Sequence, residues 1–230
     1  PMEYKVRILA ILPETHETKR LIVDKPEGYQ FLPGQSAFIS LKGDNETKKP
    51  YSLASSNYSP NLEFYIKAYD GHFGLSKKID KLSPGSEIFI SEPLGSLSYK
   101  GPGYFIAGGT GITPFLSIFR QLDEEKLIEG NELYYANKTS LDIIAEKELR
   151  VLLGKNCTFT LSREKRLGYE TKLIDKNYLE TKTNCYKKFF YLCGPQKMVM
   201  DTVQALSQLG VQPEKIIYEN LLIEEGRAAA

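Results

Sequence analysis

The chain has 230 residues, of which 41% are hydrophobic and 26% are charged, and its formal net charge is +1. This length suits two domains that each bury a core, and the balanced charge gives no general attraction to nucleic acid or anionic lipid. Charged residues interrupt the N-terminal apolar residues and no apolar stretch is long enough to cross a bilayer, so we expect a cytoplasmic protein that binds neither membrane nor nucleic acid.

The first part of the chain alternates short apolar runs with turn residues. These runs predict strands over residues 5–12, 19–24, 36–41, 62–69 and 86–91. A short helix is expected over residues 74–82, where Leu75, Ile79 and Leu82 fall on one face. Strands that follow one another without intervening helices indicate an antiparallel sandwich or a small closed barrel.

From residue 103 onward, strands alternate with helices. The predicted strands cover residues 103–109, 131–137, 157–162, 188–194 and 214–220, and the predicted helices cover residues 113–122, 140–154 and 195–210. This alternation indicates a parallel sheet with helices on its faces. We therefore expect one domain over residues 1–99, a second over residues 103–225, and a loose tail over residues 226–230.

A glycine-rich turn, FIAGGTGITPF (residues 105–115), joins the first strand of the second domain to its first helix. Such a turn presents backbone N–H groups and the positive end of a helix dipole to a phosphate. The third glycine of a Rossmann fingerprint is replaced by Pro114, which is expected at the first helical position with Thr113 as the cap. No acidic residue stands in YYANKTS (residues 134–140), where the next strand ends, and a tight turn without a ligand is the alternative.

A second turn, YLCGPQKM (residues 191–198), also ends a buried strand before a helix. Two such turns can flank one crevice at the carboxyl ends of the strands of a doubly wound sheet. Cys193 is then either an inert buried thiol or a residue that touches a reacting ring.

The stretch KKPYSLASS (residues 48–56) places a cation, an aromatic ring and a hydroxyl close together in the first domain. A tyrosine can stack on a planar ring, a serine can reach a ring nitrogen, and a lysine can pair with a phosphate. The alternative is an amphipathic strand whose tyrosine lies in the core. Further on, DGHFGLS (residues 70–76) is a glycine turn that opens a helix and offers another anion site.

The three cysteines include no C-x-x-C pair, which argues against a disulfide framework, a zinc knuckle and a four-cysteine iron–sulfur cluster. His16 and His72 lie far apart in the sequence, and neither is part of a metal-ligand motif. We therefore expect no metal.

In their order and spacing these motifs resemble the ferredoxin–NADP reductase superfamily over nearly the whole chain. The matching stretches are Lys49 to Ser52, Gly71 to Ser76, Gly108 to Pro114, and Cys193 to Met198. YYANKTSLDIIAEKEL (residues 134–149) further resembles the branch that contains haem-protein and flavoprotein reductases. The resemblance implies an N-terminal antiparallel Greek-key β-barrel that binds FAD and a C-terminal α/β Rossmann-like domain that binds NADPH or NADH.

The resemblance also implies roles for individual residues. Tyr51 would stack on the isoalloxazine, Ser52 would approach its N5, and Cys193 would lie beside the nicotinamide. The implied FAD-binding residues are Lys49, Pro50, Tyr51, Ser52, Tyr65, Ile66, Lys67, Gly74, Leu75 and Ser76. The implied nucleotide-binding residues are Gly109, Thr110, Gly111, Thr113, Ser162, Arg163, Tyr169, Cys193, Gly194 and Met198. The implied catalytic residues are Ser52, Cys193 and Glu219.

Two departures from the family pattern stand out. Lys49 replaces an arginine and so keeps a point charge without the planar fork. Leu221 stands where members carry an aromatic residue that covers the flavin, and Tyr218 is out of phase for that role, whereas Glu219 matches a glutamate of the family.

The resemblance implies an NAD(P)H-dependent FAD reductase that passes electrons to a separate acceptor: a ferredoxin, a flavodoxin, an oxygenase or a haem protein. A flavin-binding electron-transfer or regulatory subunit that does not itself oxidise NAD(P)H is the alternative. We expect FAD rather than FMN because the turn before residue 76 offers a site for a pyrophosphate. We expect a preference for NADPH because a Ser-Arg pair at residues 162–163 meets the 2′-phosphate in NADPH-specific members.

Overall fold

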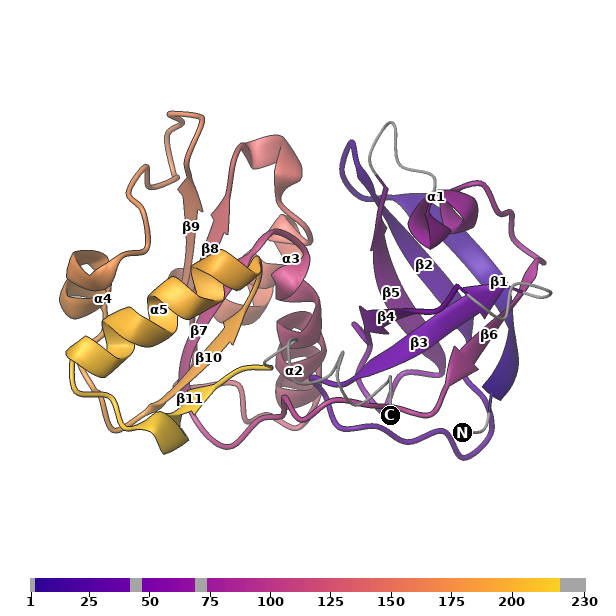
Figure 1. Ribbon diagram of the computed structural model, residues 1–230, viewed down its shortest axis with the longest axis horizontal. Coiled ribbons are helices and arrows are strands. Elements are labelled where there is room, and N and C mark those ends of the chain that lie inside the picture. Colours follow the sequence, from indigo (N-terminus) through magenta and orange to yellow (C-terminus); the bar gives the residue numbers. More distant parts are fainter. Residues whose placement is uncertain (1–2, 42–46, 69–73, 220–230) are drawn as a thin grey trace.

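We describe a computed structural model of the protein, in which residues 3–41, 47–68 and 74–219 are described. The N-terminal part is a six-stranded sheet of β1 (Glu3–Pro13), β2 (Thr18–Asp24), β3 (Ser36–Leu41), β4 (Lys49–Ser52), β5 (Asn61–Lys67) and β6 (Glu87–Ser91). Its order is β4-β3-β6-β1-β2-β5, and every pair is antiparallel (Figure 1). The sheet nearly closes, since the N–H of Ala54, just after β4, donates to the carbonyl of Glu63 on β5 at 2.8 Å.

These contacts confirm the predicted antiparallel barrel. The alternating residues of its strands fill one core, and the short helix α1 (Leu75–Asp80) adds Leu75 and Ile79 to it. The part of the predicted anion turn that precedes Gly74 lies outside the described residues.

The second part is a parallel five-stranded sheet of β7 (Gly103–Gly108), β8 (Glu132–Asn137), β9 (Cys157–Leu161), β10 (Phe189–Cys193) and β11 (Ile216–Ile217), in the order β11-β10-β7-β8-β9. Alternate strand residues face opposite sides. One side packs against α2 (Ile112–Glu124) and α3 (Glu146–Leu153), and the other against α4 (Lys176–Lys182) and α5 (Gln196–Gln208). The predicted α/β domain is therefore confirmed.

The single helix predicted over residues 140–154 is wrong. A 3₁₀ turn covers Ser140–Asp142, and the side chains and backbone of Thr139 and Asp142 close it as a capping box. Ala145 then adopts a left-handed φ of 55°, which no helix can continue through, so α3 begins only at Glu146. Likewise, the strand predicted over residues 214–220 is reduced to Ile216–Ile217.

Helix α4 has no counterpart among the predicted elements. It begins after Asp175, whose carboxylate accepts a hydrogen bond from the N–H of Tyr178 at 2.9 Å. None of the helices in the described part of the chain is long and apolar enough to cross a membrane.

A largely buried polar contact joins the two domains. Arg120 on α2 lies 3.0 Å from the Glu63 carboxylate on β5 and 2.7 Å from the Glu148 carboxylate on α3. Its guanidinium also donates to the carbonyl of Ala54 at 3.0 Å. These hydrogen-bonded charges fix α2 against the barrel, and with it the glycine turn that precedes α2.

Candidate functional site

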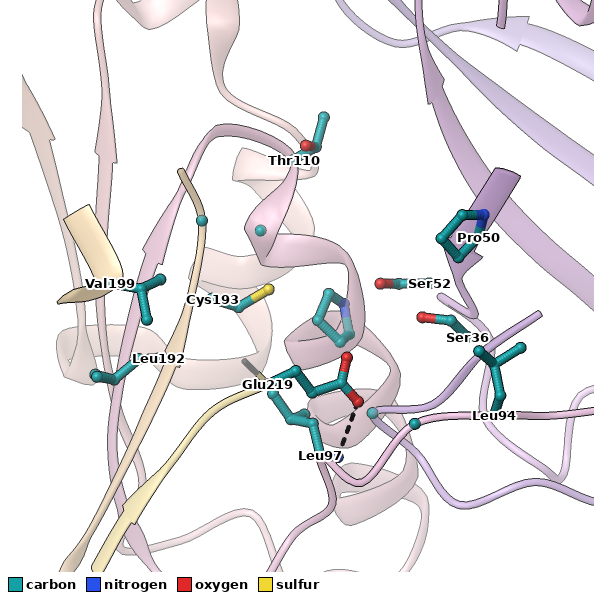
Figure 2. A pocket seen from close by; sticks show the side chains of 15 residues that line it. Ser36, Pro50, Ser52, Leu94, Leu97, Thr110, Leu192, Cys193, Val199 and Glu219 are labelled. Atoms are coloured by element: carbon teal, nitrogen blue, oxygen red, sulfur yellow. Dashed lines mark hydrogen bonds between the residues drawn. The ribbon is translucent and has the colours of Figure 1, made fainter. Parts of the chain in front are cut away.

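The strand order of the second domain locates one crevice. The chain runs from β7 outward to β8 and β9, and then returns to β10 on the other side of β7. In doubly wound sheets ligands bind at such a switch point, beyond the carboxyl ends of the strands. A cavity of about 320 Å³ opens there, between the sheet and the barrel (Figure 2).

Both domains line this cavity. The barrel contributes Gly34, Ser36, Pro50 and Ser52, and the connection toward β7 contributes Leu94, Gly95 and Leu97. The second domain contributes Thr110, Gly111, Pro114, Leu192, Cys193, Gly194, Val199 and Glu219. The hydroxyls of Ser36 and Ser52 and the carboxylate of Glu219 point into the same space (Figure 2).

The two glycine turns that the sequence predicted as neighbours lie directly against each other. A Cβ on Gly111 would overlap the carbonyl of Cys193, and one on Gly194 would lie 3.0 Å from the N atom of Gly108. A Cβ on Gly108 would lie 2.7 Å from the sulfur of Met198. Met198 therefore packs against both turns, next to Gly108 and Gly194.

The outer part of the first turn is open. Gly109 has a left-handed φ of 55°, a Cβ there would meet nothing within 4 Å, and Thr110 is exposed. The hydroxyl of Tyr135 donates to the carbonyl of Gly109 at 2.7 Å and holds the turn from the β8 side. A ligand can thus approach the backbone of this turn closely.

The predicted helix start needs correction. Helix α2 begins at Ile112 with Gly111 at the N-cap, so Thr113 is not the cap and Pro114 is the third helical residue. Thr113 is buried, and its hydroxyl donates to the carbonyl of Thr110 at 2.8 Å. The Thr113 hydroxyl is therefore engaged within the protein, where it stabilises the turn.

Cys193 and Glu219 meet at the floor of the cavity. Burial, together with the nearby Glu219 carboxylate, raises the pKa of the Cys193 thiol to about 12, so the thiol is neutral at physiological pH. Glu219 accepts a hydrogen bond from the N–H of Leu97 at 3.1 Å (Figure 2). A Cβ on Gly95 would overlap this carboxylate, so the glycine turn on the barrel side makes room for it.

On the barrel side, Tyr51 links β4 to α1. Its hydroxyl lies 2.6 Å from Oγ of Ser76. Burial raises the pKa of Tyr51, and this effect is larger than the opposite effect of the hydrogen bond with Ser76. The ring packs partly against the barrel core. Pro50 and Ser52 line the cavity, whereas Lys49 is exposed at the start of the strand.

Several residues that the resemblance assigns to the flavin have side chains that are buried or paired. Tyr65 is 5% exposed and packs into the core of the second domain, while Ile66 and Leu75 lie in the barrel core. Lys67 pairs with Glu17 at 3.5 Å. Gly74 is exposed at the start of α1, where its backbone is accessible.

The residues of the predicted 2′-phosphate site differ in exposure, since Ser162 and Arg163 are exposed and Tyr169 is partly buried. Ser162 and Arg163 are exposed beyond the end of β9, and no hydrogen bond or ion pair holds the Arg163 guanidinium within the described residues. The hydroxyl of Tyr169, in contrast, donates to the Glu146 carboxylate at 2.7 Å and 2.8 Å. The Tyr169 hydroxyl is engaged in this contact.

The position of Glu164 could not be predicted from the sequence, where it stands among the residues of the predicted 2′-phosphate site. Its carboxylate accepts hydrogen bonds from the N–H of Ser140 at 2.7 Å and from the Ser140 hydroxyl at 2.9 Å, which hold its pKa below the usual range. It therefore stands beside the carboxyl end of β8, where dinucleotide folds place an acid for the ribose. The sequence has no acidic residue directly at the end of β8, and Glu164, which follows β9, reaches back to this position.

The chain matches two domain families. Residues 8–99 match the oxidoreductase FAD-binding domain, and residues 105–204 match the oxidoreductase NAD-binding domain. The reductase component of propane 2-monooxygenase from Rhodococcus jostii is 29% identical over 94% of this chain and 63% of its own length. The ferredoxin–NAD(P)+ reductase component of the naphthalene 1,2-dioxygenase/salicylate 5-hydroxylase systems from Ralstonia is 29% identical over 92% of this chain and 67% of its own length. The chain thus spans about two thirds of these relatives.

Solved structures share the fold. A ferredoxin NADP+ reductase from Neisseria gonorrhoeae with bound FAD and NADP superposes with a TM-score of 0.84 at 21% identity, covering 96% of this chain and 99% of the other. The FAD/NAD-binding domain of a nitric oxide dioxygenase from Vibrio cholerae gives 0.82 at 19% identity, covering 94% and 97%.

Proposed function

Because the chain belongs to the ferredoxin–NADP reductase superfamily and joins an FAD-binding domain to an NAD-binding domain, we propose that it is an NAD(P)H-dependent FAD reductase serving a separate electron acceptor. FAD, when bound, would supply the redox chemistry by taking a hydride from the nicotinamide and passing the electrons on. One observation carries the proposal: a single cavity is lined by Ser52 of the barrel and by Cys193 and Glu219 of the second domain. Groups from both nucleotide-binding domains thus face one space.

The barrel residues suit a flavin at the mouth of this cavity. We assign Tyr51 to stacking on the ring system and Ser52, whose hydroxyl points into the cavity, to a hydrogen bond with the ring edge. Exposed Lys49 and the backbone around Gly74 and Ser76 are assigned to the pyrophosphate. The 2.6 Å contact between Tyr51 and Ser76 supports this assignment, since it holds the stacking residue and the phosphate-binding turn together.

The second domain suits the nicotinamide nucleotide. The open backbone of Gly109 and Thr110 is assigned to its pyrophosphate, and the close-packed backbone of Gly111 and Gly194 to positioning of the ring. Among the described residues that line the cavity only Cys193 and Glu219 are titratable, and the thiol stays neutral. We therefore assign proton exchange to Glu219 and alignment of the ring to Cys193.

For the nucleotide we propose a preference for NADPH. Exposed Arg163 and the neighbouring Ser162 offer a guanidinium and a hydroxyl to a 2′-phosphate. Glu164 opposes this preference by placing a negative charge nearby, but Arg166 lies 3.8 Å from its carboxylate and offsets that charge. The ratio of the activity with NADPH to the activity with NADH measures which of these charges dominates.

The acceptor is proposed from the relatives. Two of them are reductase components of oxygenase systems, and one of these is named a ferredoxin–NAD(P)+ reductase component. We infer that this chain likewise delivers electrons to a ferredoxin or to an oxygenase component. The domain limits at residues 1–99 and 103–225 and the cytoplasmic location stay predictions.

The test is anaerobic reduction of the purified yellow protein. We expect the flavin absorbance to bleach on addition of NADPH, and flavin released by heat to run as FAD on chromatography. Bound FAD that neither NADPH nor NADH bleaches would contradict the proposal and favour a flavin-binding electron-transfer or regulatory subunit. FMN as the released flavin would contradict the assignment of the pyrophosphate site.

A further inference from the structure

Three side chains with metal-binding atoms meet where the two domains touch. His16, Glu17 and Asp142 each place one donor atom within 4.8 Å of the other two. His16 and Glu17 belong to the turn between β1 and β2 of the barrel, whereas Asp142 follows β8 in the second domain. We propose that these side chains form a binding site for one divalent transition-metal ion of the Zn²⁺ class, which would tie the two domains together.

The two segments that carry these residues are held against each other independently of the site. The carboxylate of Glu14, in the same turn as His16, accepts a hydrogen bond from the N–H of Ala145 at 2.7 Å. Ala145 has the left-handed φ of 55° that interrupts the helical conformation before α3. The approach of His16 to Asp142 is therefore built into the docking of the two domains.

Each carboxylate is oriented by a second partner. Oδ2 of Asp142 accepts hydrogen bonds from the N–H and the hydroxyl of Thr139, both at 2.9 Å, while Oδ1 faces His16. Oε2 of Glu17 lies 3.5 Å from the ammonium of Lys67, while Oε1 faces His16. In each carboxylate one oxygen is held by a neighbouring group and the other faces His16. Metal-ligating carboxylates are commonly supported by hydrogen bonds in this way.

The spacing of the donor atoms is close to that of a tetrahedral site. Nitrogen and oxygen ligands lie about 2.0–2.1 Å from Zn²⁺, so two ligands of a tetrahedron are about 3.3 Å apart. Nε2 of His16 lies 3.4 Å from Oδ1 of Asp142 and 4.0 Å from Oε1 of Glu17. The Glu17 and Asp142 oxygens lie within 4.8 Å of each other, so Glu17 would need to move by at least about 0.7 Å to reach the ideal spacing. Its partly exposed side chain can do this by rotation.

The donor set and the exposure also fit this class of ion. One imidazole and two carboxylates are ligands that Zn²⁺ accepts, and three protein ligands leave a fourth position for water. His16 is 51% exposed, so an ion can enter from solvent. The sequence predicted no metal because these residues are not close enough along the chain to form a motif; the fold brings Asp142 to His16.

The test is calorimetric titration of Zn²⁺ into the FAD-loaded protein. We expect one site in the wild type and binding weakened by at least about tenfold in His16→Ala and in Asp142→Asn. The asparagine keeps an acceptor for Thr139 while removing the charge. His72→Ala, which changes the only other histidine, is the matched control and should bind as the wild type does.

Thermal unfolding gives a second readout. The same Zn²⁺ concentration should raise the Tm of the wild type and of His72→Ala by more than that of Asp142→Asn. A wild type that binds no Zn²⁺ would overturn the proposal and leave His16 as an ion-pair partner of Asp142. Zn²⁺ binding of unchanged strength in both His16→Ala and Asp142→Asn would also overturn it, because the ion would then lie elsewhere.

Discussion

Gly111 lies so close to the backbone of Cys193 that a Cβ on Gly111 would overlap the Cys193 carbonyl. This contact joins the ends of β7 and β10 at the floor of the cavity. Because backbone atoms stand on the Cys193 side, rotation of a side chain cannot relieve the overlap. The two turns therefore keep their spacing only while residue 111 is glycine.

Gly111→Ala should separate the two turns and slow flavin reduction by NADPH by about tenfold or more, because ring alignment is sensitive to displacements of this size. The FAD content should stay close to that of the wild type, since the change lies in the other domain. Stopped-flow absorbance measures the rate. Gly154→Ala is the control for backbone strain away from the cavity, because a Cβ there meets nothing within 4 Å although φ is +55°, and it should reduce at the wild-type rate. Reduction of Gly111→Ala at the wild-type rate would contradict the assignment of the Gly111 backbone to positioning of the nicotinamide ring.

Cys193→Ser should fold, retain FAD and reduce more slowly, because the smaller oxygen alters the packing beside the ring. Burial raises the thiol pKa to about 12, so the wild-type thiol stays protonated from about pH 6 to about pH 9. Reduction rates of the wild type and the variant should therefore follow pH in the same way over this range. A titration near pH 8.5 that is present only in the wild type would show an ionising thiol and would contradict the prediction.

Tyr51→Ala should weaken FAD binding by up to about tenfold, corresponding to a stacking contribution of about 0.5–1.5 kcal/mol beyond the buried area. Tyr51→Phe keeps the ring and loses only the hydrogen bond to Ser76, so its FAD affinity should lie between that of the wild type and that of Tyr51→Ala. Flavin titration of the apoprotein measures the affinity. Tyr58→Ala, at an exposed tyrosine on the α2 side, should bind FAD as the wild type does. An unchanged affinity and spectrum in Tyr51→Ala would place Tyr51 in the barrel core alone.

Arg163→Ala should lower the ratio of kcat/KM for NADPH to that for NADH by about tenfold, the value of a hydrogen bond to a charged group. Glu164→Gln should raise the ratio, because it removes the negative charge beside the proposed phosphate site. Lys165→Ala changes a neighbouring exposed cation and serves as the control. A wild type that favours NADH, or a ratio that Arg163→Ala leaves unchanged, would refute the phosphate-site assignment.

Arg120→Met should lower the free energy of unfolding by about 3 kcal/mol, because it leaves the largely buried Glu63 carboxylate without one of its charged partners. Arg20 still pairs with Glu63 and limits the loss. Lys197→Met removes an exposed pair with Asp201 and should cost no more than about 0.5 kcal/mol. Urea unfolding measures both. Equal effects of the two substitutions would show that the Arg120 contact does not stabilise the joined domains.

Local patterns in the sequence predicted most of the fold. The periods of the apolar runs distinguish barrel strands from strands that alternate with helices, and they depend only on neighbours along the chain. The glycine turns at residues 108–111 and 193–194 were also visible, since close backbone packing excludes side chains. These turns, with KPYS at residues 49–52, carried the resemblance that the two domain matches confirm.

Other features depended on contacts between distant residues. Ala145 interrupts the predicted helix over residues 140–154 with a left-handed φ, and its N–H is bound by Glu14 of the other domain. The Tyr169 hydroxyl is engaged by Glu146, whereas Glu164 comes to the end of β8 through Ser140. Sequence periodicity and turn chemistry determined which elements form, since both are local. Only the packing of the elements decided which polar groups are already paired and which face a ligand, since those partners lie far apart along the chain.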